Sequence, residues 1–197
     1  MLSSGNTHGP ELLTTSGIQV FDDNGDSFIT VASHGFPADE VYHPNKDGEL
    51  IGHVTYKIPD ADISLVRLCP NQYYDNETFT TNIPEGIIDG QRIKGIRKTD
   101  LRFGDIVTMD NPFLGWLGGL FVGDHFIRLP EDENRWVKCH WLYLGNDIEP
   151  TNGSCGSPIL DKDGFVVSFF RFMTETFRGC GLGIAAGTLP EYGYHVE

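Results

Sequence analysis

The feature that most restricts the fold is a series of short segments of alternating apolar and polar residues, separated by clusters of turn-forming residues. Candidate strands cover residues 17–22, 27–33, 52–57, 63–68, 106–110, 117–123, 125–128, 136–144, 157–160, 165–172 and 183–186. Turn sequences such as DDNGD, PNKDGE and DKDG lie between them, and no segment shows the 3.6-residue periodicity of a helix. This pattern predicts an all-β chain of the sandwich or barrel type.

Charge and hydropathy exclude several classes of partner. The formal net charge is −14, which argues against a nucleic-acid partner, because phosphate contacts require clustered Lys and Arg. No run of about 18 apolar residues is present, so we expect no transmembrane helix and no membrane partner. The N-terminus has neither the basic start nor the apolar block of a secretory signal. We therefore expect a cytoplasmic protein or a domain released from a larger polyprotein.

The four cysteines do not form a metal-binding or disulfide pattern. None of them has Cys-x-x-Cys spacing, so no metal site or other cofactor is expected. Without a secretion signal, disulfides are not expected either. Cys69, Cys139 and Cys180 are expected to be ordinary buried thiols. Only Cys155 has a distinctive setting, between two glycines and just before a proline.

The sequence around this cysteine, NGSCGSPI, is typical of a nucleophile rather than of a structural thiol. Gly153 and Gly156 permit a tight turn with positive φ that exposes backbone amides. A nucleophile that attacks a carbonyl needs such amides to stabilise the oxyanion, and we expect the amides of Gly153 and Cys155 to serve. A neighbouring imidazole would generate the reactive thiolate. Ser154 and Ser157 flank the thiol and are the alternative nucleophiles.

Two further residues are candidates for the general base and for the carboxylate that orients it. His34 follows the β-branched strand of DSFITVASHGFP, where a rigid element meets a loop; a lone histidine is more often structural. Asp62 precedes the apolar strand of DADISLVRL, where its carboxylate can accept a hydrogen bond from a histidine Nδ1–H and fix the tautomer. Asp62 alternatively caps a turn, and Asp60 is the competing carboxylate.

In the order His, Asp, Cys, these motifs resemble those of the chymotrypsin-fold proteases. FITVASHGF is similar to the family's strand ending in Thr-Ala-x-His, DADISLVRL to its Asp-Ile-x-Leu motif, and NGSCGSPI to its Gly-x-Ser-Gly-Gly-Pro motif with Cys in place of Ser. The cysteine version resembles picornaviral proteases, and CGSPILDKDGFVV is similar to potyviral polyprotein proteases. The resemblance covers about residues 16–190 and does not assign a viral or cellular origin.

The resemblance implies two antiparallel six-stranded β-barrels with the active site between them. A flexible leader would occupy residues 1–16, a first barrel with His34 and Asp62 residues 17–90, and a second barrel with Cys155 residues 91–197. The polar stretch 82–100 is the expected linker, and its basic residues form either a binding patch or, more often, an exposed connector. By the same resemblance, the chain is a cysteine endopeptidase that acts on polypeptides. His34 is the general base, Asp62 orients it, and Cys155 forms a thioester.

The sequence departs from the family at two places. Viral relatives carry a histidine on the strand after the nucleophile that reads a P1 glutamine, and Phe170 stands there instead. Phe169 and Phe170, followed by Phe172 and Met173, suggest an apolar S1 wall, although they are alternatively core residues. Arg171 is the candidate if P1 is acidic. The N-terminus also lacks the family's Ile-Val-Gly-Gly start, so no zymogen step of that kind is expected.

Two other functions stay open at this point. The first is a catalytically inactive pseudoprotease that serves as a protein-binding or regulatory module, because fold alone does not fix function. Its degenerate members usually lose a triad residue, whereas His34, Asp62 and Cys155 are all chemically competent. The second is a zinc site formed by the same three residues, which lack the usual ligand spacing. The sequence does not indicate the oligomeric state.

Overall fold

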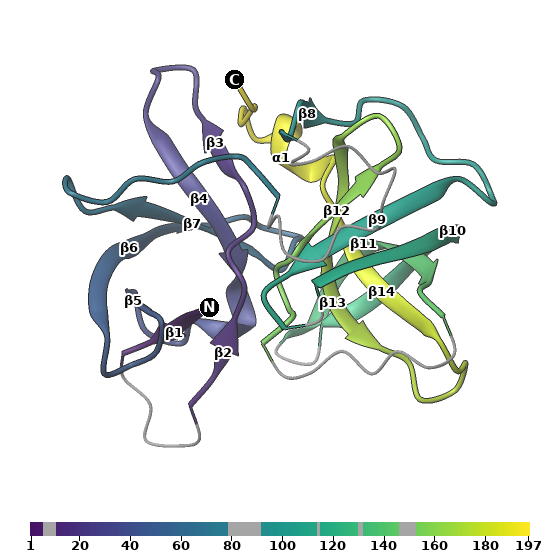
Figure 1. The fold of residues 1–197 in the computed structure, drawn as a ribbon, viewed down its shortest axis with the longest axis horizontal. Helices are drawn as coiled ribbons and strands as arrows, with labels where there is room; N and C mark the ends of the chain where they lie inside the picture. The colour runs from purple at the N-terminus through teal and green to yellow at the C-terminus, as the bar shows by residue number, and fades with distance from the viewer. Residues whose placement is uncertain (6–10, 79–91, 114, 130–131, 146–152) are drawn as a thin grey trace.

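The computed structural model describes residues 1–5, 11–78, 92–113, 115–129, 132–145 and 153–197. Within these ranges the chain is almost entirely strand and turn, apart from a 3-10 turn, η1 (Ser33–Gly35), and a short helix, α1 (Thr188–Glu191). No helix of these ranges has the length and apolar character needed to cross a bilayer. The strands form two antiparallel lobes that lie side by side (Figure 1).

The first lobe is a sheet of seven described strands that does not close. Its order is β2-β1-β5-β6-β7-β4-β3. The strands are β1 (Leu2–Ser4), β2 (Leu13–Thr14), β3 (Gln19–Phe21), β4 (Ser27–Ala32), β5 (Glu40–His43), β6 (Glu49–Lys57) and β7 (Ile63–Leu68). Because β2 and β3 lie at opposite edges, this lobe is a half-barrel.

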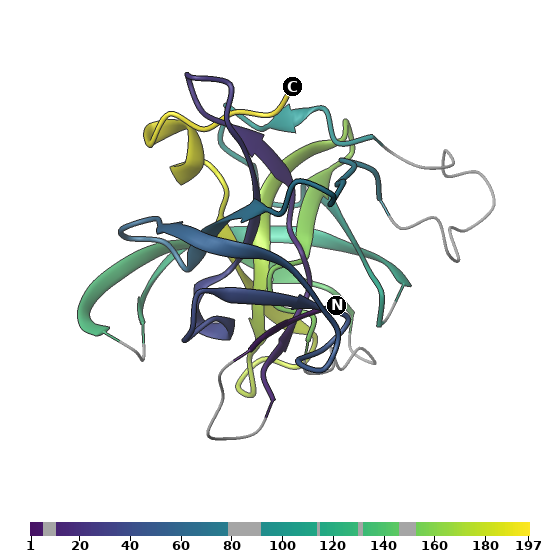
Figure 2. The ribbon, with the colours of Figure 1, turned by 90° about the vertical axis from the view of Figure 1, so that its left-hand side faces the viewer.

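The second lobe closes on itself. Its strands are β8 (Gly95–Ile96), β9 (Ile106–Asn111), β10 (Gly115–Leu129), β11 (Asp132–Tyr143), β12 (Pro158–Asp161), β13 (Phe165–Met173) and β14 (Cys180–Ala185). Strand β12 pairs with both β9 and β13 and so completes a barrel of six strands, to which β8 adds in parallel along β13. Paired strands β10 and β11 extend beyond the rest of this lobe (Figure 2).

The predicted all-β arrangement of two barrel-like lobes is confirmed, with differences in detail. The first lobe is a half-barrel rather than a closed six-stranded barrel. The two strands predicted over residues 117–123 and 125–128 are one continuous strand, β10, in which the register shifts between Phe121 and Gly123. Strands β1, β2, β5 and β8 were not predicted. The boundary between residues 90 and 91 and the first part of the expected linker, residues 82–91, lie outside the described residues. The described part, residues 92–100, holds β8, and its Ile93 and Ile96 side chains pack in a core cluster rather than in an exposed connector.

The expectation of a flexible leader over residues 1–16 does not hold for its described parts. Strand β1 pairs with β2 and β5, and its Leu2 side chain packs in the core of the first lobe. Thr14 and Thr15 are also buried. The physical reason is that Leu2 and the Leu13–Thr14 strand offer apolar and β-branched side chains that the open sheet needs for its inner face.

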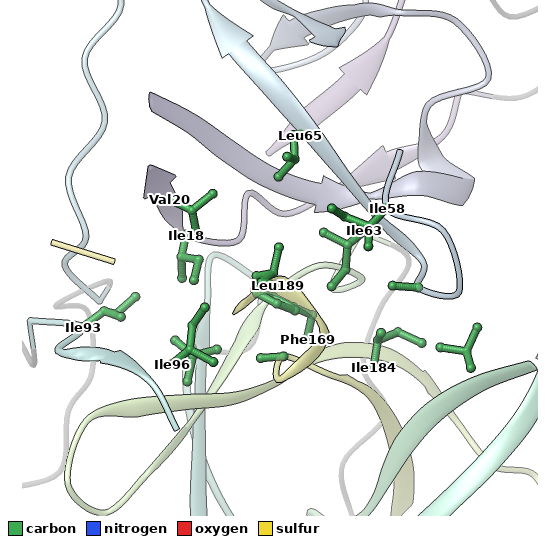
Figure 3. Packing of buried hydrophobic residues seen from close by; sticks show 14 of the residues in the cluster. Ile18, Val20, Ile58, Ile63, Leu65, Ile93, Ile96, Phe169, Ile184 and Leu189 are labelled. Carbon is green, nitrogen blue, oxygen red and sulfur yellow. The ribbon is translucent and has the colours of Figure 1, made fainter. Parts of the chain in front are cut away.

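A shared apolar cluster joins the two lobes. Ile18, Ile63 and Leu65 from the first lobe meet Ile96, Phe169 and Ile184 from the second, and Leu189 of α1 lies among them (Figure 3). Behind α1 the chain returns to the first lobe, where His195 forms a backbone bridge with Phe21 and Tyr194 packs edge-on against Phe28. The C-terminal tail therefore lies against β3 and β4.

Replacing Phe169 with Ala tests the role of this cluster. Phe169 is 4% exposed at the junction of the lobes, and deleting a buried phenylalanine typically costs about 3–5 kcal/mol. We expect the free energy of unfolding, measured by urea denaturation, to fall by that amount. Phe172 on the same strand is 40% exposed, so Phe172→Ala is the matched control and should cost well under half as much. Equal losses would contradict the assignment.

Candidate functional site

His34 and Asp62 form a hydrogen-bonded pair at the edge of the first lobe. His34 lies in η1, directly after β4, and its Nδ1 is 2.6 Å from Asp62 Oδ2. The other carboxylate oxygen, Oδ1, accepts a hydrogen bond from the His34 backbone amide at 3.0 Å. Asp62 is buried, whereas the His34 side chain is partly exposed. One carboxylate thus fixes both the ring and the backbone of His34.

Strand pairing places these two residues together. Ala32 at the end of β4 is opposite Ile63 at the start of β7, so the residues beyond each end are neighbours. The Ser33 amide donates to the Asp62 carbonyl at 3.2 Å, and the hydroxyls of Ser33 and Ser64 are 2.7 Å apart. Within the described residues, the carboxylate that contacts the His34 ring is Asp62, and the competing carboxylate, Asp60, is exposed. The geometry therefore selects Asp62 over Asp60.

Cys155 lies in a turn of the second lobe that requires its two glycines. Gly153 and Gly156 have φ values of +107° and +88°, in the region that favours glycine. A Cβ at Gly156 would lie 2.5 Å from the Thr15 carbonyl oxygen, and one at Gly153 would collide with the Phe113 ring. The two glycines are thus explained by both backbone conformation and close packing.

Thr15 of the first lobe holds this turn from across the interface. Its hydroxyl donates to the Gly153 carbonyl at 2.8 Å, and its amide donates to the Cys155 carbonyl at 2.9 Å. On the other side, the Gly156 amide donates to the Phe170 carbonyl at 2.9 Å. Sequence reasoning missed Thr15, because its stretch was expected to be a leader; the β-branched pair Thr14-Thr15 was the available signal for a strand.

The backbone amides of the turn differ in their hydrogen bonds. Within the described ranges, neither the Gly153 amide nor the Cys155 amide donates to a backbone carbonyl, whereas the Gly156 amide does. The role of the Gly153 and Cys155 amides as oxyanion donors stays a prediction. Of the alternative nucleophiles, Ser154 and Ser157 are fully buried, and the Ser157 hydroxyl donates to the Ser154 carbonyl at 2.7 Å. Cys155 alone of these three is partly exposed.

The Cys155 thiol is protonated in this arrangement. It donates to the backbone carbonyl of Arg171 on β13 at 2.8 Å. Burial, and then the negative charge of Asp62, raise the pKa of the thiol to about 11. Because the thiolate is the nucleophile, a base must remove this proton during a reaction.

Arg171 approaches the same site with its side chain. Its guanidinium donates to Asp62 Oδ2, the oxygen that also faces the His34 ring, and contacts His34 Nδ1. The side chain is buried, and burial lowers its pKa to about 10, so it remains a cation at neutral pH. Arg171 was the candidate for substrate binding if P1 is acidic, and that role stays a prediction. The sequence gave no signal of the contact with Asp62 and His34.

Phe169 and Phe170 do not form an exposed S1 wall. Phe169 packs in the cluster between the lobes and Phe170 in the core of the second barrel. They point to opposite sides of β13, as alternate residues of a strand do, and both sides are covered. The reading of both phenylalanines as core residues therefore fits the structure.

The other cysteines and a separate cavity lie outside the group formed by His34, Asp62 and Cys155. Cys139 is fully buried, but Cys69 and Cys180 are partly exposed rather than buried as expected. In the described parts of the chain, no group of three or more His, Cys, Asp or Glu is placed to hold a metal ion. A cavity of about 590 Å³ is lined by Trp136, His140 and Tyr192 among others. None of His34, Asp62 and Cys155 lines it.

Comparison with known proteins supports the fold. Neither a protein-family model nor the sequence of a curated protein matches the chain. Among solved structures, a glutamic-acid-specific serine protease described as using a histidine triad in substrate binding has a TM-score of 0.73 at 13% identity, covering 100% of this chain and 97% of its own. Thermobifida fusca protease A has a TM-score of 0.70 at 16% identity, covering 98% and 93%.

A Cellulomonas bogoriensis chymotrypsin has a TM-score of 0.62 at 14% identity, covering 93% of this chain and 98% of its own. At these identities the similarity establishes the chymotrypsin-like double-barrel fold. It does not by itself carry over an activity or a nucleophile, and no relative with a cysteine nucleophile is among these three.

The contact between Thr15 and the nucleophile turn predicts a measurable loss. In Thr15→Val the side-chain shape is kept, but the buried Gly153 carbonyl loses its hydroxyl donor. A lost buried hydrogen bond costs about 1–3 kcal/mol, and we expect a drop of that size in the free energy of unfolding. Thr55→Val is the control, since its hydroxyl bond to the Leu65 carbonyl is long at 3.3 Å. A Thr15→Val variant as stable as the parent would remove Thr15 from the site.

The raised pKa of Cys155 predicts the pH dependence of its alkylation. Only the thiolate reacts with iodoacetamide, so the rate should rise about tenfold per pH unit from pH 7 to 10, as expected for a pKa of about 11. Modification at each cysteine would be followed by mass spectrometry, with the partly exposed Cys180 as the internal control. A plateau in the Cys155 rate near pH 7 would show instead that a stable thiolate is already present.

Proposed function

We propose that the protein is a cysteine endopeptidase that hydrolyses peptide bonds through a thioester acyl-enzyme. The observation that carries the proposal is the joint placement of three groups on a chymotrypsin-like double barrel. They are the His34–Asp62 pair, 2.6 Å apart, the Cys155 thiol across the lobe interface, and the glycine turn with amides available for an oxyanion. The two solved structures of similar fold with TM-scores of 0.73 and 0.70 are proteases, which supports peptide hydrolysis in general.

The first half of the reaction forms the thioester. The S–H bond turns from the Arg171 carbonyl toward the His34 Nε2, which takes the proton as Sγ attacks the peptide carbonyl carbon. The carbonyl π-bond electrons move to the oxygen, and the amides of Gly153 and Cys155 stabilise the oxyanion. When the tetrahedral intermediate collapses, the C–N bond breaks. His34 then gives its proton to the leaving amine.

The second half releases the acid product. His34 takes a proton from water, whose oxygen attacks the thioester carbonyl, and the C–S bond breaks as the proton returns to the thiol. Asp62 keeps the His34 ring in one tautomer with Nδ1–H toward the carboxylate. Because the thiol is protonated in the resting arrangement, the mechanism uses His34 as a true general base rather than a preformed thiolate–imidazolium pair.

The substrate is proposed to be an extended polypeptide, with its P1 preference unassigned. Phe169 and Phe170 are covered by the protein core and do not enter the proposal. The alternative function, a pseudoprotease that binds protein partners, shares the fold and the same surfaces. It is distinguished by turnover alone, so the test must detect bond cleavage.

The test is cleavage of a proteome-derived peptide library under reducing conditions, with the parent protein beside Cys155→Ala. We expect cuts with the parent and a loss of at least about 10³-fold in Cys155→Ala, as for removal of a covalent nucleophile. Cys180→Ala, which removes another partly exposed thiol, is the control and should cleave like the parent. Cuts by Cys155→Ala at the parent rate would refute the nucleophile, and no cuts by a folded parent would favour the pseudoprotease.

A further inference from the structure

Arg171 is the residue that touches every member of the proposed triad. Its backbone carbonyl accepts the Cys155 thiol at 2.8 Å, and its guanidinium contacts both Asp62 Oδ2 and His34 Nδ1. The side chain is 7% exposed, so these contacts occur away from bulk water. Its neighbours on β13, Phe169 and Phe170, pack in the cluster between the lobes and in the core of the second barrel.

The chemistry of the guanidinium limits what His34 can do. A guanidinium only donates hydrogen bonds and does not lose its charge near neutral pH. It therefore competes with the Nδ1–H of His34 for the same oxygen of Asp62. An imidazolium at His34 would place two cations side by side at low local dielectric, which is unfavourable. A neutral imidazole carries no such penalty.

We propose that Arg171 is a positioning residue that tunes His34: it holds Asp62 ionised and in place while it disfavours the protonated imidazole, so that His34 stays neutral and able to accept a proton in mildly acidic solution. The role in catalysis rests on the proposed function, but the effect on His34 does not. Arg171 thereby offsets the effect of Asp62, which alone would stabilise the imidazolium.

Within the described residues, the charged groups that contact the His34 ring are Asp62, before β7, and Arg171, on β13. Cys155 lies before β12, and its thiol, with a pKa of about 11, is neutral in the pH range concerned. From β6, Lys57 donates its ammonium to the Phe36 carbonyl at 3.2 Å, in the turn that follows His34. The balance at His34 therefore lies between the carboxylate of Asp62 and the guanidinium of Arg171.

The experiment is an NMR titration of the His34 ring, with its signal assigned by comparison with His34→Gln. In the parent, we expect the midpoint below the ordinary histidine value of about 6.5. A midpoint above about 7, as for a histidine paired with a carboxylate alone, would overturn the proposal without any variant of Arg171.

Variants of Arg171 then test whether its positive charge sets the His34 midpoint. Arg171→Met keeps the aliphatic stem and should raise the His34 midpoint by about one pH unit, the usual effect of a nearby charge. Arg171→Lys retains a cation and should restore most of the parent value. Arg97→Met is the matched control, since Arg97 pairs with Asp161 at 3.0 Å elsewhere in the second lobe, and should leave His34 unchanged. A folded Arg171→Met with an unshifted midpoint would make Arg171 merely structural.

The NMR titration tests the role of Arg171, and the cleavage assay tests the endopeptidase, so either hypothesis can be refuted without the other. A low His34 midpoint with no peptide cleavage would support Arg171 as the group that tunes His34 and refute the endopeptidase. Cleavage that depends on Cys155, together with a His34 midpoint that Arg171→Met does not shift, would support the endopeptidase and refute the role of Arg171. If both hold, the acidic limb of the pH–rate profile should move upward by about one pH unit in Arg171→Met, together with the NMR midpoint.

Discussion

Apolar packing between the two lobes is the interaction on which the rest of the molecule depends. Each half of the candidate site belongs to a different lobe: His34 and Asp62 lie at the ends of β4 and β7, and Cys155 and Arg171 belong to the second barrel. Nothing within either lobe sets the distance between these halves. Ile63 directly follows Asp62, and Phe169 lies two residues before Arg171, and both are buried in the shared cluster. The packing of Ile63 and Phe169 therefore also fixes the positions of their polar neighbours, Asp62 and Arg171.

The electrostatics of the site follow from the same burial. A thiol withdrawn from water holds its proton more strongly, and a buried carboxylate nearby adds to that effect. A reaction at Cys155 therefore needs a base that is unprotonated when substrate arrives. The Arg171 cation, brought in by β13, acts in that direction on His34, and it also supplies the counter-charge that a buried Asp62 requires. The Arg171 side chain thus both neutralises a buried carboxylate and keeps His34 able to accept a proton.

The sequence was informative where a single pattern decided the outcome. Alternation with β-branched residues located β4, β7, β9 and β13 closely, and the motifs around His34, Asp62 and Cys155 identified residues that the structure brings to one place. It was uninformative where a strand is only two or three residues long, as with β1, β2 and β8, because periodicity needs a longer window. Side-chain direction on β13 was also undetermined, since a shift of one residue exchanges the two faces. For that reason the sequence did not decide which of Phe169, Phe170 and Arg171 faces a core and which faces the interface of the lobes.

The bond between Thr15 and Gly153 joins residues 138 positions apart. Contacts of such sequence separation form late, because the intervening chain must be ordered first. During synthesis the first lobe emerges with its histidine and aspartate before the nucleophile turn exists. The turn reaches its final shape only after β12 and β13 are available to close the barrel and to supply the Phe170 carbonyl. The complete site therefore forms only when both lobes have folded. A partly synthesised chain has some of the site residues but not their final arrangement.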